Sequence, residues 1–319
     1  KQIAVLLLVF WGWGMGYAPF SLGTASAEPS EKLGADQKDA NQAATQRNNS
    51  LAKSTEQLRE RYREKASHFH EYVAPGEEPA SSASLRELYV ALAGLQLVKA
   101  ADYEEGNTMR PHGSAEQCVT WAQDLMDEEN PDRIPRRIQH EAYVELAYLS
   151  RIDQSPQPDF VCIPPGYEES EKTYPLMVGL HGWVPSTSRI NPCLLPSYAA
   201  EIAKEHNVLL VVPHGRRNTD YKYVGEADVL RVLQEVKTFF RVDASRTYLT
   251  GVSMGGVGAW QIGAHYPDKF AAIAPVNGQT DWFEFWHEHF QFPPRDRMTQ
   301  HLRLLFQASG NGVEKEPVF

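Results

Sequence analysis

Residues 246–258 read Arg-Thr-Tyr-Leu-Thr-Gly-Val-Ser-Met-Gly-Gly-Val-Gly, and this stretch decides the fold. Within it, Gly251, Ser253 and Gly255 spell Gly-x-Ser-x-Gly. Three specified residues at ordinary usage give about 0.1 chance matches in a chain of this length, so the pattern alone is weak. Its setting is specific, because a predicted strand precedes it and a predicted helix follows, as a serine on a sharp strand-to-helix turn requires. We therefore predict that Ser253 is a nucleophile lifted into a cleft above a helix N-terminus, which favours negative charge.

Strand and helix patterns alternate on both sides of this turn. Two short, almost wholly apolar runs, 174–180 and 208–213, are typical of strands buried on both faces of a sheet. Further strands are predicted at 143–149, 160–167, 246–251 and 270–276, and helices at 198–206, at 225–240 and from Ser253 onward. This order predicts an α/β fold with a doubly wound, mostly parallel sheet, whose site lies at the carboxyl ends of the strands.

A second motif follows the buried strand 174–180. Acyl transfer needs two preorganised N–H donors for the developing oxyanion. We expect one to be the backbone N–H of Met254, directly after the nucleophile, and the other that of Trp183, with Gly182 as the next choice. His181 is interpreted as a structural residue that orients this loop, because the order Ser–acid–His puts the base later in the chain.

With these motifs in place, the chain resembles the α/β-hydrolases. The stretches that carry the resemblance are 181–182, 212–215, 225–228, 242–256 and 266–275. Within that superfamily the sequence is similar to exported serine hydrolases of the prolyl-oligopeptidase-like and feruloyl-esterase-like kinds, over about residues 140–283. The resemblance implies a Ser–Asp–His triad with Ser253 as nucleophile, acting on esters or peptides. Asp228, Asp243 and Arg246 match positions of that group and are interpreted as framework residues.

The acid and the base of such a triad are not obvious in the sequence. In the fold that the chain resembles, they follow strands that come after 271–276, and Val318-Phe319 reads like the start of one. Our hypothesis is therefore that the hydrolase domain is C-terminally truncated, with acid and base beyond Phe319. The alternative is Asp281 as acid with a later histidine as base. The histidines available for that role are His287, His289 and His301.

Residues 282–290, between Asp281 and these histidines, read as an aromatic-rich helix that packs or forms a lid. A metal site at His287 and His289 is disfavoured, because residues two apart do not share a helix face.

The N-terminal half lacks the alternation of strand and helix patterns. Residues 1–27 combine a positive start, a short apolar run and an Ala-x-Ala site, which predicts a signal peptide; an uncleaved membrane anchor is the alternative. Residues 28–50 read as a polar linker. Residues 51–135 read as a helical appendage, with a Ser114/Gln117 capping box opening one helix. Residues 136–319 are predicted to form the hydrolase domain.

Composition narrows the functional classes. The 319 residues hold 31 Lys and Arg against 41 Asp and Glu, a formal net charge of −10, which argues against electrostatic binding of nucleic acid. Three cysteines, at 118, 162 and 193, fit neither a disulfide framework nor a zinc pattern, and buried free thiols are favoured. We expect no cofactor, no metal, and contact with a membrane only if the N-terminal segment is retained.

The sequence as a whole predicts an exported, periplasmic or extracellular serine hydrolase that cleaves a carboxylic ester, small or polymer-linked, through an acyl-enzyme on Ser253. A peptidase of the prolyl-oligopeptidase type is the nearest alternative. A non-catalytic binding protein that keeps the hydrolase scaffold is the alternative from another class.

Overall fold

The computed structural model describes residues 52–69, 84–107, 113–135, 139–140, 143–184, 195 and 197–280. The chain divides into two compact units, Lys1–Gly278 and Gln279–Phe319, and every element below lies in the first. The predicted signal peptide 1–27, the linker 28–50, and Asp281 with the histidines after it lie outside the described residues.

A seven-stranded sheet organises the first unit, in the order β1-β2-β3-β5-β4-β6-β7. Strands β4, β5, β6 and β7 run parallel to one another, whereas β3 runs antiparallel to both β2 and β5. Because β2 therefore points the same way as β5, five of these seven strands share one direction, and the predicted mostly parallel sheet is confirmed. The strands are β1 (Gln139–His140), β2 (Tyr143–Leu149), β3 (Pro156–Cys162), β4 (Tyr174–Leu180), β5 (Leu209–Pro213), β6 (Val242–Val252) and β7 (Ala272–Val276).

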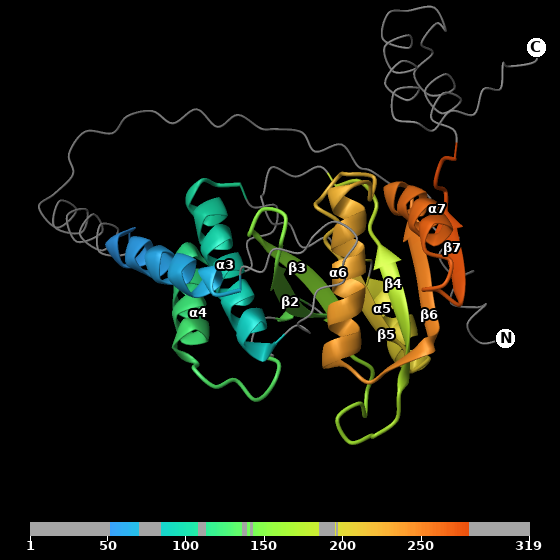
Figure 1. The fold of residues 1–319 in the computed structure, drawn as a ribbon, viewed down its shortest axis with the longest axis horizontal. Helices are drawn as coiled ribbons and strands as arrows, with labels where there is room; N and C mark the ends of the chain where they lie inside the picture. The colour runs from blue at the N-terminus through green and yellow to red at the C-terminus, as the bar shows by residue number, and fades with distance from the viewer. Residues whose placement is uncertain are drawn as a thin grey trace, which may run out of the picture. The chain divides into compact units, whose positions relative to one another are not determined.

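Helices cover both faces of the sheet (Figure 1). Helix α5 (Ser197–Glu205) packs on one face, in a cluster with side chains of β3 and β5. Helices α6 (Val224–Phe239) and α7 (Met254–His265) pack on the other. The doubly wound arrangement follows from β4 and β5 themselves, which are buried almost throughout and so need cover on both sides.

Two strands begin earlier than the sequence pattern predicts. β3 starts at Pro156 rather than Phe160, because antiparallel pairing with β2 continues to Leu149 opposite Pro156. β6 starts at Val242 rather than Arg246, because Val242 pairs with Tyr174 before a register shift in the ladder. Local hydrophobicity shows only the apolar part of each strand, whereas backbone pairing extends beyond it.

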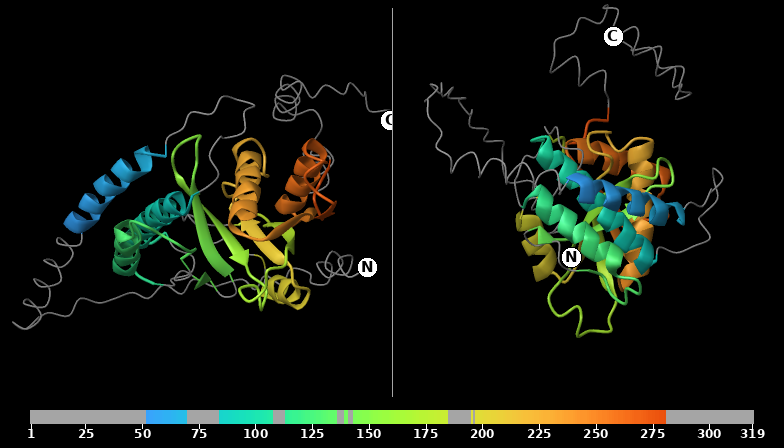
Figure 2. Two further views of the ribbon diagram at one scale, coloured as in Figure 1. Left: turned by 60° about the horizontal axis from the view of Figure 1, so that its bottom comes forward. Right: turned by 90° about the vertical axis from the view of Figure 1, so that its left-hand side faces the viewer.

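Before the sheet come helices over residues 52–67, α3 (Leu85–Glu104) and α4 (Ala115–Asp127). Ser84 caps α3, and the Ser114 hydroxyl accepts from the Gln117 N–H at 3.1 Å, which is one of the two bonds of the predicted capping box. The three helices are seen together in Figure 2, where the helix over residues 52–67 is blue. All three helices lie within residues 51–135, and the bounds of that segment as a separate domain stay a prediction.

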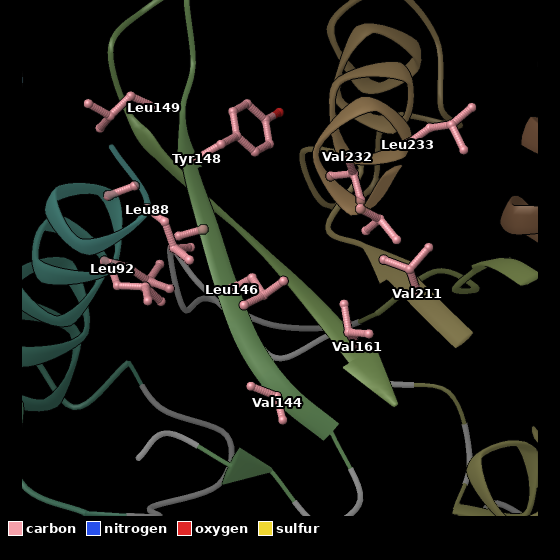
Figure 3. Close-up of a cluster of buried hydrophobic side chains, with 14 of the residues drawn as sticks. Leu88, Leu92, Val144, Leu146, Tyr148, Leu149, Val161, Val211, Val232 and Leu233 are labelled. Atoms are coloured by element: carbon pink, nitrogen blue, oxygen red, sulfur yellow. The ribbon is translucent and has the colours of Figure 1, made fainter. Parts of the chain in front are cut away.

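This helical segment shares one hydrophobic core with the sheet. Leu88 and Leu92 of α3 lie beside Leu146 and Leu149 of β2 (Figure 3), and all four side chains belong to a single buried cluster. The same cluster continues across β3 and β5 to α6, through Val161, Val211 and Val232. Removing α3 would therefore expose apolar surface of β2, so the segment is part of the folded unit.

The remaining sequence expectations concern cysteines and membrane spans. Cys118 and Cys162 are buried free thiols, and burial raises the pKa of Cys118 to about 11; Cys193 lies outside the described residues. Over the described ranges, no helix has both the length and the apolar character to cross a bilayer.

Candidate active site

Ser253 occupies the turn between β6 and α7 in a strained backbone conformation. Its φ of 57° and ψ of −118° are rare for a residue with a side chain, and the side chain is exposed. The Ser253 N–H donates to the Val276 carbonyl at 2.9 Å, which fixes this conformation against β7. Strain of this kind persists where the surroundings over-determine the backbone, and it gathers at functional sites. The sharp strand-to-helix turn predicted for Ser253 is present.

The glycines of the motif are needed because backbones meet here. A Cβ on Gly251 would lie 2.8 Å from Leu180 Cβ, and one on Gly256 would lie 2.6 Å from the Val276 carbonyl oxygen. A Cβ on Gly255 would lie 2.8 Å from the His181 carbonyl oxygen. Real Cβ atoms essentially never approach other atoms this closely, so the start of α7 reaches the strand ends only without side chains.

The loop after β4 lies beside the serine. A Cβ on Gly182 would lie 3.8 Å from Ser253 Cβ, so Gly182 and Ser253 face each other across the site. His181 is 2% exposed, with Nδ1 2.7 Å from the Gly182 carbonyl and Nε2 2.9 Å from the His214 carbonyl. Burial lowers the pKa of His181. A neutral ring carries one N–H and donates it to one of these two carbonyls, and the closeness of both agrees with its interpretation as the residue that orients the loop.

These contacts constrain the expected oxyanion donors. In a trans peptide the C=O and N–H point in opposite directions, so turning the Gly182 carbonyl toward His181 turns the Trp183 N–H away from that ring. Met254 is the first residue of α7, so its N–H has no intrahelical acceptor and lies at the positive end of the helix dipole. The assignment of both groups as oxyanion donors stays a prediction.

The loop after β5 begins with a buried histidine. His214 is 2% exposed, and neither ring nitrogen has a partner among the described residues. Burial, with neighbouring positive groups, lowers the pKa of His214 to about 3. Arg216 pairs with Asp153 at 2.8 Å instead of facing solvent alone. His214 is therefore a neutral core residue, because the strand end on which it sits is covered.

The expected framework residues act as such. The buried Asp228 carboxylate accepts from the Gly215 N–H at 2.7 Å and from the Tyr148 hydroxyl, and burial raises the pKa of Asp228 to about 6. Asp243 accepts from Arg246 Nε at 2.6 Å near the start of β6, at the opposite end of that strand from Ser253.

The general base is not found in the described part of the chain. No side chain there hydrogen-bonds to Ser253 Oγ, and Asp281, His287, His289 and His301 lie outside it. The described residues also contain no group of three or more His, Cys, Asp or Glu placed to hold a metal ion.

Two residues near the site were missed by sequence reasoning. Tyr221 is fully buried between Gly215 and Gly258, and its hydroxyl donates to the His181 carbonyl at 3.3 Å. Asn218 is exposed and contacts the backbone of Val184. Both lie in a polar run that is typical of a solvated loop, and only the flanking glycines hint at close packing.

Comparisons with known proteins found one matching family and several similar structures. Residues 214–301 match the prolyl oligopeptidase family. Among solved structures, the chain is similar to a thermostable esterase (19% identity over 52% of this chain and 51% of that one, TM-score 0.35). It is also similar to an S-formylglutathione hydrolase from Staphylococcus aureus (21% identity over 56% of this chain and 72% of that one, TM-score 0.40). A ferulic acid esterase is similar at 20% identity over 52% of this chain and 68% of that one, with a TM-score of 0.37. The chain spans about half the length of the thermostable esterase.

Proposed function

We propose that this chain, an α/β-hydrolase similar to the prolyl oligopeptidase family, is a serine hydrolase that cleaves a carboxylic ester through an acyl-enzyme on Ser253. The observation that carries the proposal is that Ser253 is an exposed residue on a backbone of φ 57° and ψ −118°, close to Gly182. A merely structural serine in a glycine-rich turn does not require this strain, whereas a nucleophile presented to a cleft does.

The chemistry follows from the groups around the hydroxyl. Ser253 Oγ attacks the ester carbonyl carbon while a base outside the described residues takes its proton. The negative charge that develops on the carbonyl oxygen is stabilised by the N–H groups of Met254 and Trp183. Collapse of this tetrahedral intermediate breaks the bond to the alcohol, which leaves with a proton from the same base, and water then hydrolyses the acyl-enzyme by the reverse sequence.

A peptidase is the second candidate, and the family match over 214–301 favours it. The two activities differ in the leaving group, because an amide nitrogen has to be protonated as it departs, whereas an alkoxide leaves more readily. The test compares p-nitrophenyl acetate with a proline p-nitroanilide in the full-length protein and in its Ser253→Ala variant. Turnover of the acetate alone, lost in the variant, supports the esterase; Ser253-dependent turnover of the anilide favours the peptidase; turnover independent of Ser253 contradicts both.

We further propose that the protein is exported and begins near Glu28 after removal of residues 1–27. The proposal rests on the charge, apolar run and Ala-x-Ala site of that stretch. Mass spectrometry of protein recovered outside the cytoplasm tests it: a mature N-terminus near Glu28 supports cleavage, and an intact first segment contradicts it.

A further inference from the structure

We propose that Asn218 is a positioning residue for the oxyanion donor Trp183, a role that rests on the serine hydrolase function proposed above. Asn218 lies on the loop between β5 and α6 and touches the loop after β4 through its side chain. The Val184 N–H donates to Asn218 Oδ1 at 2.9 Å, and Asn218 Nδ2 donates to the Val184 carbonyl at 2.8 Å. One side chain thus holds both polar groups of the residue that follows Trp183.

These two bonds hold the residue after Trp183 and so restrict the orientation of the Trp183 N–H. The Trp183 N–H belongs to the peptide that Gly182 and Trp183 share, and His181 Nδ1 lies 2.7 Å from the carbonyl of that same peptide. The next peptide carries the Val184 N–H and is held by Asn218. A peptide plane rotates only by changing the torsions that join it to its neighbours, so holding the Val184 peptide restricts the direction of the Trp183 N–H.

Asn218 is itself anchored to a rigid part of the fold. Positive φ values occur at many positions of its loop: Gly215, Arg216, Arg217, Asp220, Tyr221 and Tyr223. Such conformations persist only where other contacts enforce them. Here Thr219 Oγ1 donates to the Gly215 carbonyl at 2.6 Å, and the Asp228 carboxylate accepts from the Gly215 N–H.

Tyr221 ties this loop to the site a second time, through its hydroxyl and the His181 carbonyl. The loop between β5 and α6 therefore acts as a fixed support, and the side-chain amide of Asn218 reaches from it to the loop after β4 that carries Trp183. Preorganised donors are effective because they do not reorganise during the reaction.

The test exploits the exposure of Asn218, whose truncation removes no core packing. In the full-length protein, N218A should lower kcat for p-nitrophenyl acetate about tenfold, less than the loss of a whole oxyanion donor, with KM changed less than about twofold. N218D keeps the shape but replaces the Nδ2 donor by a charged acceptor facing the Val184 carbonyl, so it should lose at least as much. The control is T120A, which removes a similar exposed side-chain bond, to the Glu116 carbonyl at 3.0 Å in α4, and should match wild type.

The outcomes test the positioning role of Asn218 and the hydrolase function separately. Loss of kcat in both Asn218 variants, with an unchanged unfolding midpoint, supports the positioning role. Wild-type kcat in either variant overturns it while the hydrolase function stands, and so does a loss that disappears once rates are divided by the folded fraction. If wild type and Ser253→Ala turn over equally, the hydrolase function fails, and the role of Asn218 fails with it.

Discussion

Gly255 lies directly against the backbone of Leu180, so that a Cβ on Gly255 would come within 2.7 Å of the Leu180 carbonyl carbon. The first turn of α7 and the last residue of β4 are therefore in backbone contact. This contact sets the spacing between the two loops of the site, because Ser253 precedes Gly255 by two residues and Gly182 follows Leu180 by two. The geometry at Ser253 thus depends on a glycine that takes no part in the chemistry.

Replacing Gly255 should lower the stability of the folded protein. G255A forces a methyl group into the backbone of Leu180 and His181, and we expect it to lower the free energy of unfolding by about 3 kcal/mol. The control is G106A, where φ is +70° but nothing lies within 4 Å of the new methyl group, so backbone strain alone should cost about 1 kcal/mol. Urea denaturation of the two variants measures both, and equal costs would contradict the close packing described here.

A buried ion pair should make the N-terminal helices essential to stability. Arg231 of α6 contacts Glu87 of α3 at 2.9 Å and Glu235 at 2.8 Å, and all three side chains are nearly buried. R231A removes the cation that contacts both buried carboxylates, and we expect a loss of about 3 kcal/mol in the free energy of unfolding.

The matched control for Arg231 is R59A, which breaks a more exposed pair with Glu56 at 3.4 Å. Such a pair should contribute less than about 0.5 kcal/mol. A cost for R231A as small as that of R59A would show that this ion pair does not hold α3 to α6.

His214 should make the protein less stable in acid. Its folded pKa of about 3 lies below the 6.5 of an ordinary histidine, so between these values the unfolded chain binds a proton that the folded chain excludes. Stability is therefore retained above pH 6.5 and is lost as the pH falls toward 3.

The variant H214L tests this pH dependence, because leucine fills the buried site without the two ring nitrogens that have no hydrogen-bond partner. Between pH 6.5 and 5 the wild type should lose roughly 2 kcal/mol more than H214L in chemical denaturation. Parallel losses in the two proteins would place the acid sensitivity elsewhere.

Much of the sheet could be predicted because several of its strands have a recognisable local sequence pattern. β4 and β5 are short apolar runs, and the Gly-Val-Ser-Met-Gly turn lies directly between β6 and α7, so the alternation of strands and helices along the chain follows from the sequence. The ends of β3 and β6 could not be predicted, because Pro156 and Val242 become strand residues through pairing with distant partners.

The candidate site was less predictable than the fold. Ser253 and its glycines carry a motif, whereas Asn218 acts through a contact with Val184, thirty-four residues earlier in the chain. His214 follows a strand end, and its burial there is set by packing that the sequence does not reveal. Contacts between loops of this kind leave no periodic signal in a sequence.

The most direct test of the central claim is covalent labelling of the full-length protein with a fluorophosphonate, read by intact mass and by peptide mapping. We expect one adduct, located on Ser253, absent from Ser253→Ala and reduced in rate by N218A. A folded protein that remains unlabelled, or an adduct on a residue other than Ser253, would contradict the assignment of this turn as the nucleophile.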